Sequence, residues 1–130
     1  MIYSAKVEKL DDFLSYLETT MEENEVPIKV VMSFLVAAEE IFVNIASYAY
    51  PDSEGDMDVD FTIVDNTVKI VFTDSGIPFD PVSKPDPDVN ASAEERGIGG
   101  LGIYMVKKSM DGIIYEYKDN KNVLSFWKSF

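Results

Sequence analysis

Glu40-Ile-Phe-Val-Asn44 is the stretch around which the fold of this 130-residue chain can be worked out, because it lies within a long apolar pattern of helical spacing. Two residues four apart on a helix project from the same face, about one turn from each other, so Glu40 and Asn44 bring a carboxylate beside an amide. Taken alone, such a pair is more often an ordinary polar pair on a solvated helix side. Its meaning therefore depends on the other segments of the chain.

Two later segments have chemistry that suits this pair. Asp74-Ser-Gly76-Ile-Pro-Phe79 places a carboxylate after a predicted strand, and its glycine permits a turn that a side chain would obstruct. Gly97-Ile-Gly99-Gly100-Leu101-Gly102 has four glycines in six residues before a predicted helix, which suits close approach of backbone N–H groups to phosphates. The alternatives are an ordinary turn for the first segment and a lid hinge or a tight helix entry for the second. In this order, the three segments predict a nucleotide pocket.

Basic residues near the glycines are weaker indications of a phosphate site than the glycines themselves. Arg96 directly precedes them and is a candidate partner for a terminal phosphate, whereas an ion pair with Glu94 or Glu95 is an equally good interpretation. Lys107 and Lys108 fall in the last turn of the predicted helix, where the helix dipole alone favours cations, and we interpret them as structural.

Composition excludes several classes of function. The formal charge of −13, from 24 acidic and 11 basic residues, argues against direct binding to nucleic acid or to an anionic membrane. The same charge opposes a polyphosphate ligand, so a divalent cation is expected to accompany one. Without any Cys or His, the chain has no disulfide, no thiolate or imidazole metal site and no Ser-His-Asp triad. Proton transfer therefore falls to carboxylates.

Length and hydropathy predict one domain over residues 1–130. An apolar content of 46% is enough for one sizeable core and leaves little room for two. No run of eighteen apolar residues exists, and the first residues lack the features of a secretory signal, so we expect a cytoplasmic protein.

Periodicity predicts the order of the elements. We expect a strand at about residues 1–5, two helices at about 7–23 and 27–50, and an antiparallel hairpin of strands at about 58–64 and 68–73. A long loop at about 77–95, a third helix at about 101–110 and a second hairpin of strands at about 113–118 and 123–128 follow. The loop has four prolines and five acids and is unusually long for a compact domain, which is typical of a lid. The second helix is expected to bury Val30, Phe34, Ala37, Ala38, Ile41, Ile45 and Tyr48.

Together the three segments resemble the N box and the two glycine boxes of the GHKL ATPase superfamily, which has the Bergerat nucleotide-binding fold. The resemblance implies an α+β fold, a two-layer α/β sandwich whose mixed, mainly antiparallel sheet is covered by helices on one face, with an ATP lid at about residues 77–97. It also implies the site: Glu40 as catalytic base, Asn44 as Mg²⁺ ligand, Asp74 as adenine reader beside the Gly76 turn, a γ-phosphate contact at Arg96, and a phosphate border at Gly97, Gly99, Gly100, Leu101 and Gly102.

Within that superfamily, residues 37–50 and 99–111 are similar to the bacterial anti-sigma-factor serine kinases. The resemblance implies ATP-dependent phosphorylation of a serine on an anti-sigma-factor antagonist, alternate binding of a sigma factor, and a homodimer. Two other functions stay open: a nucleotide-gated partner-binding module with little or no kinase activity, and a detached ATPase domain of the histidine-kinase type, which needs a phosphoacceptor His in another protein.

Overall fold

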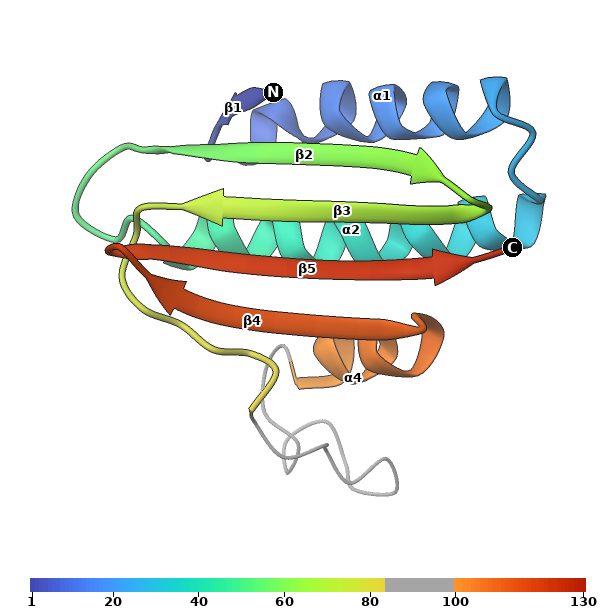
Figure 1. The fold of residues 1–130 in the computed structure, drawn as a ribbon. Helices are drawn as coiled ribbons and strands as arrows, with labels where there is room; N and C mark the ends of the chain where they lie inside the picture. Colours follow the sequence, from blue (N-terminus) through green and yellow to red (C-terminus); the bar gives the residue numbers. More distant parts are fainter. Residues whose placement is uncertain (84–99) are drawn as a thin grey trace.

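The computed structural model describes residues 1–83 and 100–130, without the side chain of Leu101. Their elements follow the predicted order of strand, helices, hairpin, helix and hairpin (Figure 1). The bounds are β1 (Ile2–Ser4), the short 3-10 helix η1 (Val7–Lys9), α1 (Leu10–Glu23), α2 (Ile28–Tyr48), β2 (Asp56–Val64), β3 (Thr67–Asp74), α4 (Gly100–Ser109), β4 (Gly112–Lys118) and β5 (Lys121–Ser129).

The strands form one sheet in the order β1-β2-β3-β5-β4. Within the described residues every pairing is antiparallel, including that of β3 with β5, which are separated in sequence by α4 and β4. The predicted antiparallel hairpins β2–β3 and β4–β5 are confirmed. The register of β3 against β5 places Asp74 opposite Asn122.

Both hairpin turns are tighter than the sequence suggested. Asp65 and Asn66 have φ of 52° and 57°, and Asp119 and Asn120 have φ of 53° and 61°, as expected for two-residue turns with both positions left-handed. Asp and Asn tolerate this region better than other residues with a side chain. The predicted connections of three and four residues were therefore too long. Because β5 begins at Lys121, Asn122 is a strand residue instead of a turn residue.

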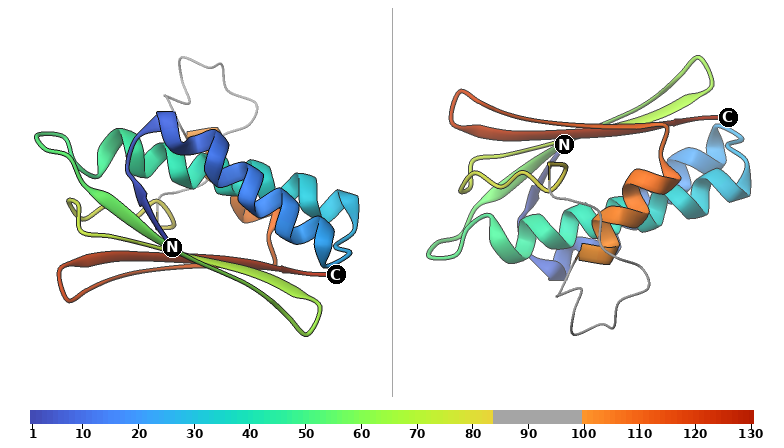
Figure 2. Two further views of the ribbon diagram at one scale, coloured as in Figure 1. Left: turned by 90° about the horizontal axis from the view of Figure 1, so that it is seen from above. Right: turned by 90° about the horizontal axis from the view of Figure 1, so that it is seen from below.

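The helices α1, α2 and α4 lie on one face of the sheet, which makes a two-layer α/β sandwich (Figure 2). Aromatic rings fill the space between the layers, and the Phe13 and Phe42 rings stack with their centroids 4.8 Å apart. The ring of Phe34 lies 5.0 Å from that of Phe126 on β5, so helix and sheet interlock directly. The predicted α+β sandwich with helices on one face is confirmed.

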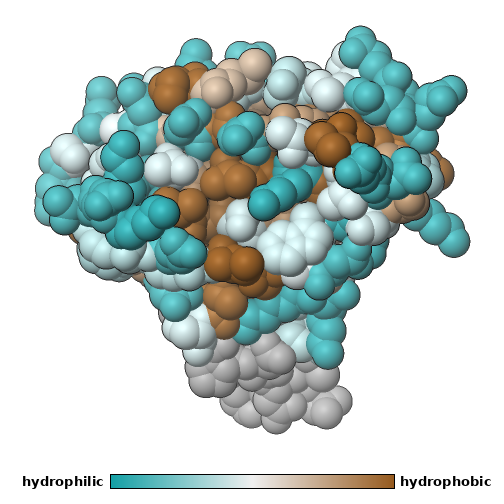
Figure 3. All heavy atoms as spheres, viewed as in Figure 1, coloured by the Kyte–Doolittle hydropathy of each residue, from teal (hydrophilic) through white to brown (hydrophobic). Residues whose placement is uncertain are grey.

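The opposite face of the sheet is open (Figure 3). Alternation along β2 directs the acidic side chains of Asp58 and Asp60 to this face, where both are exposed. The apolar side chains of Val71, Val123 and Ile114 follow on β3, β5 and β4. The predicted open face is therefore present, with an acidic side along β2.

The start of α1 differs from the predicted helix over about residues 7–23. Phe13, Leu17 and Met21 form its buried row, whereas Val7 is 54% exposed in η1. The chain begins as a 3-10 helix, which has three residues per turn, so the predicted 3.6-residue pattern does not extend back to Val7.

Among the described helices, α2 alone is long and apolar enough to cross a membrane, with a mean hydropathy of 1.7. Eight of its side chains are buried in the core, which accounts for this composition. The prediction that Tyr48 belongs to the buried face was wrong, because its side chain is 50% exposed. Ile41, Ile45 and Ala49 make the buried row at this end, and Tyr48 instead continues the neighbouring row of Glu40 and Asn44.

Two charged residues near the end of α4, Lys108 and Asp111, have local structural contacts. The Lys108 ammonium lies 5.5 Å from the centroid of the Tyr104 ring, one turn earlier on α4. Asp111 accepts a hydrogen bond of 2.7 Å from the Ser129 N–H and pairs with Lys128 at 3.8 Å. The contacts of Asp111 hold the residues just after α4 against the end of β5.

Candidate functional site

The polar pair on α2 has the geometry expected from its spacing. The Asn44 amide nitrogen lies 3.4 Å from Glu40 Oε1, and both side chains are half-buried. Since the nitrogen of this amide is turned toward Glu40, its oxygen is directed away from that carboxylate. The pair therefore offers an acid–base group and a neutral oxygen ligand side by side.

The Glu40 carboxylate also lies against the start of α4. A Cβ built on Gly102 would come within 2.5 Å of Glu40 Oε2 and closer still to Oε1. Only glycine allows this approach, which brings the carboxylate to the first turn of α4. The structure thus brings together residues 62 positions apart that the sequence assigned to one site.

Several residues of the predicted phosphate border lie outside the part of the chain that the structure describes. Arg96, Gly97 and Gly99 lie outside the described residues, and so does the side chain of Leu101. Gly100 is the first residue of α4, as the predicted helix entry requires.

Burial raises the pKa of the Glu40 carboxyl above its ordinary value. The hydrogen bond from Asn44 opposes this shift, and the neighbouring charge of Glu39 adds to it. A carboxylate with a raised pKa is a stronger base than an exposed glutamate, which favours a role in accepting a proton.

Asp74 ends β3 and is one of two buried polar residues in the described part of the chain, the other being Asn122. Its Oδ1 accepts two hydrogen bonds of 2.9 Å, from the Gly76 N–H and from the Asn122 amide. Both bonds go to Oδ1, so Oδ2 is the second acceptor of this carboxylate.

Gly76 allows the chain to pass close to the end of α2. A Cβ at this position would lie 2.6 Å from Ala49 Cβ and 2.7 Å from the Ala49 carbonyl carbon. The next N–H, of Ile77, donates to the Ala49 carbonyl at 2.9 Å. The sequence interpretation required a glycine here for the turn, and in the structure the residue that would obstruct a side chain is Ala49 at the end of α2.

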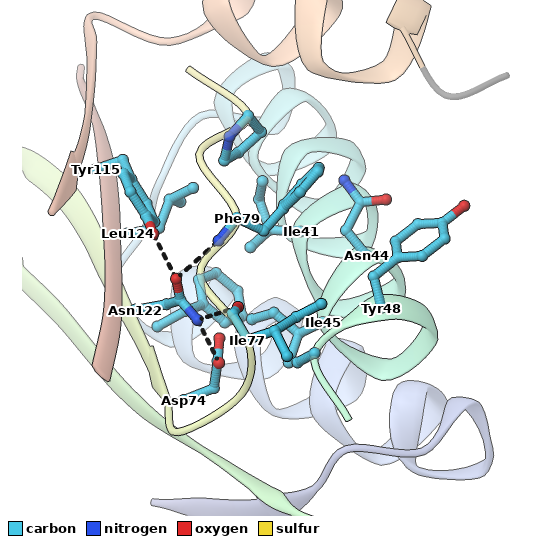
Figure 4. Close-up of a pocket in the computed structure, with 13 residues that line it drawn as sticks. Ile41, Asn44, Ile45, Tyr48, Asp74, Ile77, Phe79, Tyr115, Asn122 and Leu124 are labelled. Atoms are coloured by element: carbon cyan, nitrogen blue, oxygen red, sulfur yellow. Dashed lines mark hydrogen bonds between the residues drawn. The ribbon is translucent and has the colours of Figure 1, made fainter. Parts of the chain in front are cut away.

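A pocket between α2 and the sheet is lined by Asn44 and Asp74, whereas Glu40, Gly76 and Gly102 are not among its lining residues. Asn44 and Tyr48 from α2 border it on one side, and Asp74 and Asn122 border it on the sheet side (Figure 4). Its remaining walls are mostly apolar: Ile41, Ile45, Ala49, Phe72, Ile77, Phe79, Pro81, Tyr115 and Leu124. Apolar walls with a few convergent polar groups are typical of sites for flat organic ligands.

Asn122 and Tyr115 are pocket residues that the sequence interpretation did not identify. Asn122 was assigned to a turn, and Tyr115 was only one residue of an apolar strand. The available signal was the pair Asp119-Asn120, which is suited to a two-residue turn and would have placed Asn122 on the strand beside Asp74.

The donor set fits a magnesium nucleotide. Among the described residues no three acidic side chains gather as a metal site. A Mg²⁺ ion at Asn44 would therefore take its other ligands from water and phosphate oxygens, which is the usual way in which proteins hold this ion with nucleotides.

A family model described as "Histidine kinase-like ATPase domain" matches residues 3–128. The chain therefore belongs to this family of ATPase domains, which confirms the resemblance to GHKL ATPases and implies ATP chemistry. Among similar proteins is the "Serine-protein kinase RsbW" of Bacillus cereus strain B4264, 30% identical over 93 residues that make up 68% of this chain and 58% of that relative. Proteins of the same name from Bacillus anthracis strain A0248 and Bacillus mycoides strain KBAB4 are 30% and 29% identical over the same length. The alignment thus spans less than two thirds of these relatives.

Proposed function

We propose that this chain is a cytoplasmic, ATP- and Mg²⁺-dependent protein-serine kinase of a bacterial partner-switching system. The observation that carries the proposal is the shared border of one pocket by Asn44 and Asp74, with Glu40 hydrogen-bonded to Asn44. Family membership and the similarity to proteins named serine-protein kinases support it.

Asp74 and the apolar walls are assigned to the adenine base. Ile45 and Ile77 offer flat apolar contact, and Asp74 Oδ2 accepts a hydrogen bond from the 6-amino group. Guanine has a carbonyl at that position, which the carboxylate repels. The base end of the pocket therefore favours ATP over GTP.

The phosphates are assigned to the side of the pocket near Asn44 and the start of α4. The amide oxygen of Asn44 binds Mg²⁺, and this ion, when bound, supplies the positive charge that a chain of net charge −13 lacks. Backbone N–H groups of the glycine segment from Gly97 to Gly102, with Arg96 before it, are proposed to contact the phosphate oxygens.

Glu40 is assigned as the base for the transfer step. The serine Oγ forms a bond to the γ-phosphorus, the bond from that phosphorus to the β,γ-bridging oxygen breaks, and ADP leaves with that oxygen. The hydroxyl proton passes to the Glu40 carboxylate. Phosphoryl transfer depends mainly on positioning and charge compensation, so one base, one cation and backbone donors are sufficient.

The proposed protein substrate is an anti-sigma-factor antagonist, and the proposed second partner is a sigma factor that the kinase holds inactive. Phosphorylation releases the antagonist and leaves the kinase free for the sigma factor, with the kinase acting as a homodimer. These partners follow from the resemblance of residues 37–50 and 99–111 to anti-sigma-factor kinases.

The test compares Glu40→Ala with Glu39→Ala, its exposed neighbour. ATP binding is measured by calorimetry, and phosphoryl transfer to the cognate antagonist by radiolabel. We expect Glu40→Ala to bind ATP nearly as the unchanged protein does and to lose transfer by about 10²- to 10⁴-fold, as for a general base. Glu39→Ala is expected to retain both properties.

Three results would count against parts of this proposal. An unaltered transfer rate in Glu40→Ala removes the base role of Glu40. ATP-dependent partner binding without transfer in the unchanged protein makes the chain a nucleotide-gated binding module. Transfer to a histidine of another protein, instead of a serine, makes it a detached histidine-kinase-type ATPase domain.

A further inference from the structure

Asn122 occupies the centre of a hydrogen-bond network at the base end of the pocket (Figure 4). Its amide nitrogen donates at 2.9 Å to Asp74 Oδ1 and at 2.9 Å to the Ile77 carbonyl. Its amide oxygen accepts from the Phe79 N–H at 3.2 Å and from the Tyr115 hydroxyl. One side chain on β5 thus connects β3, the segment after it, and β4.

These contacts use the full hydrogen-bonding capacity of the amide. A carboxamide has two N–H donors and an oxygen with two lone pairs, and each has a partner here. The Tyr115 hydroxyl, placed as a donor, and the Phe79 N–H together require the oxygen of Asn122 on their side, so the nitrogen must face Asp74. The amide therefore has one orientation that satisfies all its neighbours.

The protonation of Tyr115 supports this orientation. Burial raises the pKa of its phenol, and the charges of Asp80 and Asp74 add to the shift, although a hydrogen bond from the Phe79 N–H opposes it. The phenol thus keeps its proton at neutral pH and remains a donor to Asn122.

We propose that Tyr115 and Asn122 are positioning residues for base recognition: Tyr115 orients the Asn122 amide, and Asn122 holds Asp74 so that Oδ2 meets the 6-amino group of adenine. This inference rests on the proposed ATP site. It assigns neither residue a contact with the reacting atoms. The Tyr115 hydroxyl acts on the nucleotide only through Asn122 and Asp74.

The hydroxyl is therefore expected to affect one contact with the base and not the others. Without it, the Asn122 oxygen keeps only the Phe79 N–H, the amide is free to rotate, and Asp74 Oδ1 loses a fixed donor. Binding of the 6-amino group then weakens. Apolar contacts of the base with the pocket walls do not depend on this orientation.

The test uses Tyr115→Phe, which removes only the hydroxyl, and Tyr117→Phe as a matched control. Tyr117 is two residues further along β4, and its side chain is 43% exposed. Dissociation constants are measured for ATP and for purine riboside triphosphate, which lacks the 6-amino group. We expect Tyr115→Phe to weaken ATP about 3- to 10-fold, the range of one hydrogen bond, with the purine analogue unchanged. The control is expected to change neither.

A spectroscopic readout separates positioning from a general loss of structure. The amide protons of Gly76 and Phe79 donate to Asp74 and Asn122, so their NMR shifts report the network directly. Both signals are expected to move in Tyr115→Phe and to remain in place in Tyr117→Phe, with the urea midpoint recorded for each variant.

The outcomes distinguish this inference from the proposed function. Equal losses for ATP and the analogue in Tyr115→Phe mean a purely structural role and overturn the inference, as does unchanged ATP affinity, while the kinase proposal survives both. If the unchanged protein binds no ATP, the proposed function fails and the positioning role fails with it.

Discussion

Gly76→Ala tests whether the close contact between Gly76 and Ala49 stabilises the fold and positions the pocket residues. The added methyl group would lie 2.6 Å from Ala49 Cβ and 2.7 Å from the Ala49 carbonyl carbon, so the end of α2 and the segment after β3 must separate. Overpacking of this kind costs about 1–3 kcal/mol. The bond from the Ile77 N–H to the Ala49 carbonyl stretches as the two segments part, which adds about 1 kcal/mol. We expect a total destabilisation of about 2–4 kcal/mol.

For a chain of this size that loss corresponds to a Tm lower by roughly 10 °C. Urea and thermal unfolding followed by circular dichroism measure it, and an ATP titration reports the accompanying displacement of Asp74 and Ile77. Ser75→Ala is the matched control, because Ser75 is exposed and its substitution is expected to stay within about 0.5 kcal/mol. If Gly76→Ala unfolds at the same midpoint as the unchanged protein and binds ATP equally well, the close approach does not constrain the structure and the reasoning is refuted.

Three further substitutions have distinct expected outcomes. The atoms nearest to the added methyl group in Gly102→Ala belong to the flexible end of Glu40, so the variant should lower the free energy of unfolding in urea by less than about 1 kcal/mol yet strongly reduce phosphoryl transfer, because the carboxylate must move away. Glu40→Gln should stabilise the fold at pH 7 and not at pH 4. Because the carboxyl pKa is raised in the folded state, Glu40 contributes stability at low pH that is lost as the pH rises through that pKa, and the Gln side chain has no such loss. Urea midpoints of both proteins, measured between pH 4 and pH 7, test this difference. Tyr50→Phe removes a hydroxyl that donates to the Asp56 carbonyl and accepts from the Ser75 N–H, and should cost about 1–2 kcal/mol in urea unfolding, more than Tyr48→Phe.

The element order was predictable because each segment carries its own local signal. Alternation in β2 and β3, helical spacing in α2 and the Pro27 before it depend only on neighbouring residues. The turn at Gly76 was predictable for the same reason, since a glycine after a strand is a local signal, whereas its close approach to Ala49 was not.

The residues that were missed depend on register and on the elements packed around them, and for Asn122 the local signal of the Asp119-Asn120 turn was not used. Whether Asn122 belongs to a turn or a strand depends on one choice between a four-residue and a two-residue connection. Tyr48 was assigned to the core because its spacing from Ile41 and Ile45 fits both of two adjacent rows on α2. Only the positions of the sheet and α4 around that helix decide that the row with Glu40 and Asn44 faces the pocket.

The contacts that build the pocket join distant parts of the chain, and this determines how binding and folding are linked. The Asn122 amide reaches Asp74 across 48 residues, and the Tyr50 hydroxyl reaches the Ser75 N–H across 25. None of these contacts exists until α2, β3 and β5 are assembled, so the unfolded chain cannot retain the site. A ligand that binds only the folded state stabilises it by RT ln(1 + [L]/Kd), about 2.7 kcal/mol at a hundredfold excess over Kd. Nucleotide bound at this site must therefore stabilise α2, β3 and β5 together, because it draws its affinity from the same contacts that hold those elements in register.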